Sequence, residues 1–122
     1  EGGQPVTWTI AHDVLDRRTR AVIAHGSDYD APFDARVSEE YRGEVGVSLL
    51  DPAAAWAQGH ARYRVTWPDV DVAAEAQLEV RSDADAYHVV VELAVEEAGG
   101  AGTPGIGRRE RRWERVIPRR LA

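Results

Sequence analysis

Hydrolytic chemistry needs a nucleophile with a base beside it, and few residues of this chain could supply that pair. The chain has no cysteine, so thiol nucleophiles, thiolate metal sites and disulfides are excluded. No serine lies in a Gly-x-Ser-x-Gly turn between a strand and a helix, where such enzymes present their nucleophile. The serines are Ser27, Ser38, Ser48 and Ser82. We therefore expect no catalytic residue here, and no esterase or aminopeptidase activity of the chain alone.

Metal binding needs histidines and carboxylates that converge on one point. His12 and Asp13 are adjacent, so on a strand their side chains point to opposite faces. Acidic neighbours such as Glu39 and Glu40 face apart for the same reason. The remaining histidines stand singly: His25, His60 and His88. We expect neither a metal site nor a bound cofactor.

The glycine-rich segment from Gly99 to Gly107 could be compared with a phosphate-binding loop. It leads into a predicted strand rather than a helix, and it lacks the Gly-Lys-Ser/Thr ending of such loops. The segment therefore predicts a connection between two strands.

The distribution of charge singles out the C-terminal segment. Residues 108–120 contain seven arginines and two glutamates, a local net charge of +5 in a chain of net charge −6. On a strand, Arg111, Trp113, Arg115 and Ile117 share one face. If Trp113 and Ile117 are buried, Arg111 and Arg115 need a carboxylate or carbonyl partner. We expect Arg111, Trp113 and Arg115 to make structural or interdomain contacts. Three further arginines should stay in solvent: Arg108, Arg109 and Arg112.

Alternation of apolar and polar residues predicts strands along most of the chain. It covers residues 6–10, then residues 21–24 after a turn at Asp16-Arg17, and then residues 35–49, weakened or bulged at Gly43 and Gly46. Residues 26–34 read as a loop.

The clearest alternation runs from Ala61 to Val95. A two-residue turn at Pro68-Asp69 joins Trp67 to Val70 and would place Arg62 opposite Glu75. A second turn at residues 82–85 would pair Val80 with Tyr87, and hence Leu78 with Val89. The side chains expected to face the core include Tyr63, Val65, Leu78 and Val91.

A chain of 122 residues is one domain's worth of sequence. About seven strands, with at most one short helical turn after Asp51-Pro52, predict an all-β, antiparallel β-sandwich. The alternative is a strongly curved antiparallel meander. We expect residues 1–122 to form a single domain.

The sequence also bears on partners and location. No stretch approaches the ~20 apolar residues of a membrane span. No signal-peptide core precedes the first strand, which favours the cytoplasm over secretion. The net charge argues against nucleic acid. We expect no nucleic-acid and no membrane partner, while a homo-oligomer remains open.

Several short motifs together resemble the C-terminal part of the cocaine-esterase and X-prolyl dipeptidyl-peptidase (CocE/NonD) group of serine hydrolases. The resemblance extends over nearly the whole chain. It rests on Trp8-Thr9-Ile10-Ala11-His12-Asp13, Asp51-Pro52 with Ala55, Trp67, Ser82-Asp83, Tyr87-His88-Val89, Arg111-x-Trp113 and Val116-Ile117-Pro118-Arg119. Two features depart from the family pattern: Pro68-Asp69 after Trp67, and the long glycine-rich segment 98–107.

The resemblance implies an α/β-hydrolase catalytic domain upstream in the same chain, with a serine, aspartate and histidine triad. It also implies that residues 1–122 are the C-terminal part of that larger chain, a β-sandwich of jelly-roll type. No residue of that triad corresponds to a position here, and His12 does not correspond to the catalytic base. The implied role is a non-catalytic one: packing on the hydrolase domain, shaping substrate access, and assembly. The alternative is a free-standing protein whose curved sheet holds a small apolar ligand. That ligand would lie between Trp8, Tyr63, Trp67 and Trp113.

Overall fold

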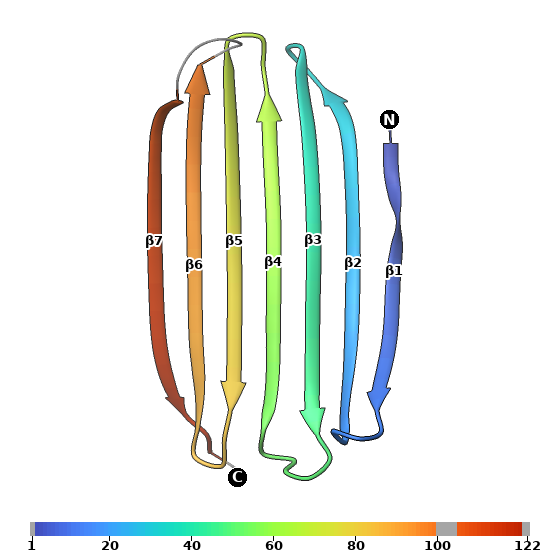
Figure 1. The fold of residues 1–122 in the computed structure, drawn as a ribbon. Coiled ribbons are helices and arrows are strands. Elements are labelled where there is room, and N and C mark those ends of the chain that lie inside the picture. The colour runs from blue at the N-terminus through green and yellow to red at the C-terminus, as the bar shows by residue number, and fades with distance from the viewer. Residues whose placement is uncertain (1, 100–104, 121–122) are drawn as a thin grey trace.

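Seven long strands account for almost all of the computed structural model, which describes residues 2–99 and 105–120. The strands are β1 (Gly2–Asp13), β2 (Arg18–Ala31), β3 (Ala35–Ser48), β4 (Ala55–Thr66), β5 (Val70–Ser82), β6 (Ala86–Gly99) and β7 (Gly105–Pro118). They form one antiparallel sheet in sequence order, with β1 and β7 at its two edges (Figure 1). The sheet does not close, because neither edge strand pairs with the other.

The prediction of an all-β, antiparallel fold is confirmed. No helix occurs among the described residues, and hence none that is long and apolar enough to cross a membrane. The segment after Asp51-Pro52 is a reverse turn, in which the Ala54 N–H donates to the Asp51 carbonyl at 2.9 Å. The choice between a sandwich and a meander depends on what covers this single sheet.

The alternation of side chains gives the sheet two different faces. Directly paired residues of antiparallel strands point to the same side, so the observed register assigns every strand position to a face. One side, here called the apolar face, carries Trp8, Ile10, Ile23, Tyr41, Val45, Ala61, Tyr63, Val65, Ala76, Leu78, Val89, Val91, Leu93, Trp113 and Ile117. The other, here called the charged face, carries Arg20, Glu44, His60, Arg62, Arg64, Asp71, Glu75, Glu92, Arg108 and Arg112.

Two of the predicted turns occur as expected. The Asp13 carboxylate accepts hydrogen bonds from the Leu15 and Asp16 N–H groups and so fixes the turn before β2. The Trp67 N–H donates to the Val70 carbonyl at 2.8 Å across Pro68-Asp69. The resulting register places Arg62 opposite Glu75, as predicted.

The predicted pairing of β5 with β6 is wrong by two residues. Val80 lies opposite Val89, and Ser82 lies opposite Tyr87. The Asp83 carboxylate accepts from the N–H groups of Asp85 and Ala86, both at 2.8 Å. These bonds close a turn tighter than the predicted one, so both strands continue further. Because the shift is even, each side chain keeps its predicted face.

Two further expectations about irregular backbone are wrong. Residues 26–31 belong to β2, and only the short turn before Ala35 interrupts the chain there. Gly43 and Gly46 cause no bulge, because the register of β3 with both neighbours is continuous. Gly46 instead lies beneath the indole ring of Trp56, its partner on β4. The predicted glycine-rich connection includes residues 100–104, which lie outside the described residues.

Little of the sheet is buried. Among the described residues only Ala35 and Val37 are buried hydrophobic side chains. Tyr63 and Leu78, predicted to face a core, are 44% and 41% exposed, although both lie on the apolar face as expected. The sequence therefore predicted the correct side of the sheet, but nothing in the described chain packs against it.

Candidate functional site

The three residues singled out on the C-terminal strand lie on the apolar face at its β7 edge. Arg111, Trp113 and Arg115 stand opposite Leu93, Val91 and Val89 of β6, respectively. The predicted sharing of one face is confirmed. The predicted burial is wrong, since Trp113 is 43% exposed and Ile117 50% exposed.

The arginines of β7 divide between the two faces. Arg115 donates to the adjacent Glu114 carbonyl at 3.0 Å, which satisfies the expectation that Arg111 or Arg115 finds a carbonyl or carboxylate partner. Arg108 and Arg112 lie on the charged face and pair with glutamates of β6 and β7. Both remain exposed, as does Arg109, so the prediction that these three stay in solvent is confirmed.

The apolar face is the largest feature available for interaction. Its exposed side chains extend from Trp8 and Ile10 on β1, which are 75% and 76% exposed, to Trp113 and Ile117 on β7. Between them lie further half-exposed side chains, namely Tyr41, Val45, Tyr63, Leu78, Tyr87 and Val95. Contiguous apolar surface on this scale marks a contact with another protein layer or with a ligand.

A polar cluster interrupts the apolar face near the turn between β2 and β3. The Tyr29 hydroxyl donates to a Glu39 carboxylate oxygen at 2.9 Å, and Ser27 donates to the other oxygen at 3.4 Å. The hydrogen bond to Glu39 raises the pKa of Tyr29 to about 12. Glu39 thus has partners within the sheet.

The charged face is a network of cross-strand pairs. Glu75 accepts from His60 at 2.9 Å and from Arg62 at 3.4 Å, and these two bonds, the first above all, lower the pKa of its carboxyl. Asp71 is held by Arg64, which lowers its pKa as well. Because these charges are partnered with one another and partly exposed, this side is suited to face solvent.

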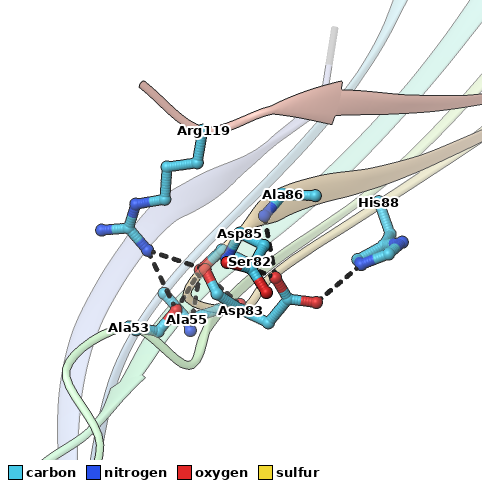
Figure 2. A network of polar contacts seen from close by, with 8 residues as sticks. All are labelled: Ala53, Ala55, Ser82, Asp83, Asp85, Ala86, His88 and Arg119. Carbon is cyan, nitrogen blue, oxygen red and sulfur yellow. Dashed lines mark hydrogen bonds and ion pairs between the residues drawn. The ribbon is translucent and has the colours of Figure 1, made fainter. Parts of the chain in front are cut away.

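A second cluster, here called the turn cluster, joins the ends of three segments (Figure 2). Arg119 Nη1 donates to the carbonyl oxygens of Ala53 and Asp83, each at 3.2 Å. The Ser82 hydroxyl donates to the Ala53 carbonyl at 2.6 Å and accepts from the Ala55 N–H at 3.1 Å. The cluster therefore ties the turn before β4 to the turn before β6 and to the end of β7.

Sequence reasoning noted Arg119 only within a family motif and missed its role. The available signal was Pro118, which cannot donate a ladder hydrogen bond and so ends a strand. The residue after it can then turn toward the neighbouring turns. Arg119 also donates its backbone N–H to the Asp85 carbonyl at 2.8 Å, which fixes this geometry.

The histidines considered as metal ligands or bases have local partners. His12 contacts the Thr19 hydroxyl at 2.8 Å, and His88 contacts the Asp83 carboxylate at 2.9 Å. Within residues 2–99 and 105–120, no group of three or more histidine, cysteine or acidic side chains is placed to hold a metal ion.

The structure does not bring together the four aromatic residues suggested for an apolar ligand. Trp8 lies on β1, Tyr63 on β4 and Trp113 on β7, while Trp67 lies in the turn after β4. Two strands of the sheet separate Trp8 from Tyr63, and two more separate Tyr63 from Trp113. They are parts of one broad surface rather than the walls of a pocket.

Compared with protein-family models, with curated proteins and with solved structures, the chain gives no match in any of the three.

Proposed function

We propose that this chain is a non-catalytic accessory domain of an α/β-hydrolase of the acyl-esterase or X-prolyl dipeptidyl-peptidase class. Its apolar face packs against another part of that protein, and its role is to support the catalytic domain and shape access to the active site. The observation that carries the proposal is the exposed apolar face from β1 to β7.

In domains, a sheet that is apolar on one side packs that side against a second layer. The described residues supply one layer, and the paired ions of the charged face suit it to be the outer surface. The covering layer must then come from elsewhere. A second sheet would complete the predicted β-sandwich, and the catalytic domain would pack beside it.

The class of the parent protein is inferred from the sequence motifs. The turn cluster supports a structural role for these motifs. The Ser82 hydroxyl donates to a carbonyl of the turn before β4, and Arg119 donates to the Asp83 carbonyl in the turn before β6. Their hydrogen bonds are directed to backbone carbonyls and to local partners. A structural domain needs such contacts, whereas a catalytic serine would need a free hydroxyl beside a base.

The first test reads the coding sequence upstream of this chain. We expect a Gly-x-Ser-x-Gly segment between a predicted strand and helix. An upstream region without any hydrolase pattern would contradict the proposed parent class.

The second test compares two substitutions on β5 in the complete protein, Leu78→Asp on the apolar face and Gln77→Asp on the charged face. Both side chains are exposed in the chain described here. If the apolar face is covered in the complete protein, Leu78→Asp should lower its melting temperature and its folded yield. Gln77→Asp should leave both unchanged. Equal effects would mean that the apolar face is not the packing surface.

A further inference from the structure

We propose that the outer edge of β1 pairs with β1 of a second copy of this chain, joining two seven-stranded sheets into one. This inference goes beyond the proposed function, because it concerns the edge of the sheet rather than its apolar face.

The two edges of the sheet differ sharply in charge. β7 carries arginines on both of its faces and two glutamates on the charged face, and charge of this kind deters a further strand from pairing. β1 has no charged residue from Gly2 to Ala11. It is also 12 residues long and rich in threonine and large apolar side chains. A long, uncharged edge strand is a template for strand addition.

The sequence of β1 is complementary to itself. In an antiparallel pair centred on Thr9, Trp8 faces Ile10 of the partner subunit, and Thr7 faces Ala11 of the partner subunit. The pair of Trp8 with Ile10 occurs twice, on the apolar face, and aromatic residues favour β-branched neighbours across strands. Thr9 would face Thr9 of the partner subunit on the charged face.

The same register avoids charge repulsion. Asp13 of each copy lies beyond the regular stretch, so the two aspartates stand at opposite ends of the interface. A β7–β7 pair would instead bring two strands of five arginines each together. A β1–β7 pair would leave a free edge at each end and continue into a filament, whereas the β1–β1 pair closes as a dimer.

The pairing leaves the apolar faces available. Residues that stand opposite each other point to the same side of a sheet, so both apolar faces lie on one side of the joined sheet. The irregularity between Gln4 and Thr7 limits the regular part of this pair to Thr7–Ala11 of each copy.

The experiment uses sedimentation velocity over a concentration series, with the wild-type chain, Thr9→Lys and Thr9→Glu. Thr9 is exposed, and far-UV circular dichroism checks that both variants keep the sheet. We expect the wild type to form a dimer. Each variant should raise the dimer dissociation constant by about tenfold or more, because like charges then face each other. An equimolar mixture of the two variants should restore the dimer.

Two control variants test whether the dimer forms through another surface of the sheet. Gln77→Lys places the same charge on the charged face of an interior strand, and Leu78→Asp places a charge on the apolar face. Both should leave the dimer intact. A monomeric wild type, self-association that survives both Thr9 substitutions, or a dimer that only Leu78→Asp disrupts would each overturn the proposal. The last result would identify the apolar face as the interface.

Discussion

The guanidinium carbon of Arg119 lies 5.7 Å from the centroid of the Tyr87 ring. A cation in this position is attracted by the face of the ring. Since Nη1 of the same side chain bonds the carbonyl oxygens of Ala53 and Asp83, Arg119 holds three segments together at one end of the sheet.

Arg119→Ala should therefore destabilise the chain, by about 1–3 kcal/mol, through loss of the contact with Tyr87 and of the charge-assisted hydrogen bonds. The control is Arg120→Ala, at an exposed neighbouring position, which should change stability by less than about 0.5 kcal/mol. Urea denaturation measures both. Equal midpoints for the two variants would show that the contacts of Arg119 contribute no stability.

Gly46→Ala should also destabilise the chain, by roughly 1–3 kcal/mol, because a Cβ at this position would overlap the indole ring of Trp56. The guanidinium carbon of Arg18 lies 5.8 Å from the centroid of the same indole ring, so Arg18 also limits how far the ring can move. Gly59→Ala is the matched control: a Cβ there would meet Leu78 at 3.8 Å, an ordinary contact. Thermal melts of both variants test the difference, and an unchanged melting temperature for Gly46→Ala would contradict it.

Asp83 should make stability depend on pH in the acid range. Its hydrogen bond with His88, together with those from the Asp85 and Ala86 N–H groups, lowers its pKa from 3.8 to about 2. A lowered folded-state pKa contributes stability above pH 3.8 that is lost as the pH falls toward 2. The melting temperature of the wild type should therefore fall more steeply between pH 4 and pH 2 than that of Asp83→Asn. Parallel curves would exclude this contribution.

Trp113→Ala should cost roughly 1.5–2.5 kcal/mol in this chain, about half the loss for a fully buried ring, because Trp113 is 43% exposed. Arg109→Ala, at an exposed site on the same strand, should cost less than about 0.5 kcal/mol. Chemical denaturation compares the two. A loss above 3 kcal/mol for Trp113→Ala would mean that the ring is covered in solution, for example by a second copy.

Alternation along the sequence was sufficient to predict the strands and the two faces. Because the side-chain period of a strand is 2, residues such as Tyr63 and Leu78 could be assigned to one side before the pairing was known. The Trp67–Val70 turn was also predictable, since proline and aspartate at its centre favour a tight connection.

The register across Asp83 and the extent of β2 were not predictable in the same way. The Asp83 side chain determines the register, because it accepts hydrogen bonds from two N–H groups of the turn. Alternation does not specify the length of such a turn. For the second, the polar residues 26–31 resemble a loop in composition, yet they pair with β3 throughout. The prediction of buried side chains was wrong for a different reason. Alternation identifies the apolar side of a sheet, but it carries no information about whether another layer covers that side.

The order of the strands also determines how such a sheet can fold. Among the described residues, each strand contacts only its neighbours along the chain. Every pairing is therefore a hairpin of low sequence separation, which needs little loop closure and favours fast, stepwise growth from any one turn. The bond from Arg119 to Ala53, which spans 66 positions, departs from this local pattern. It can form only after β4 to β7 have assembled, so it should act late and slow the unfolding of the sheet more than it speeds folding.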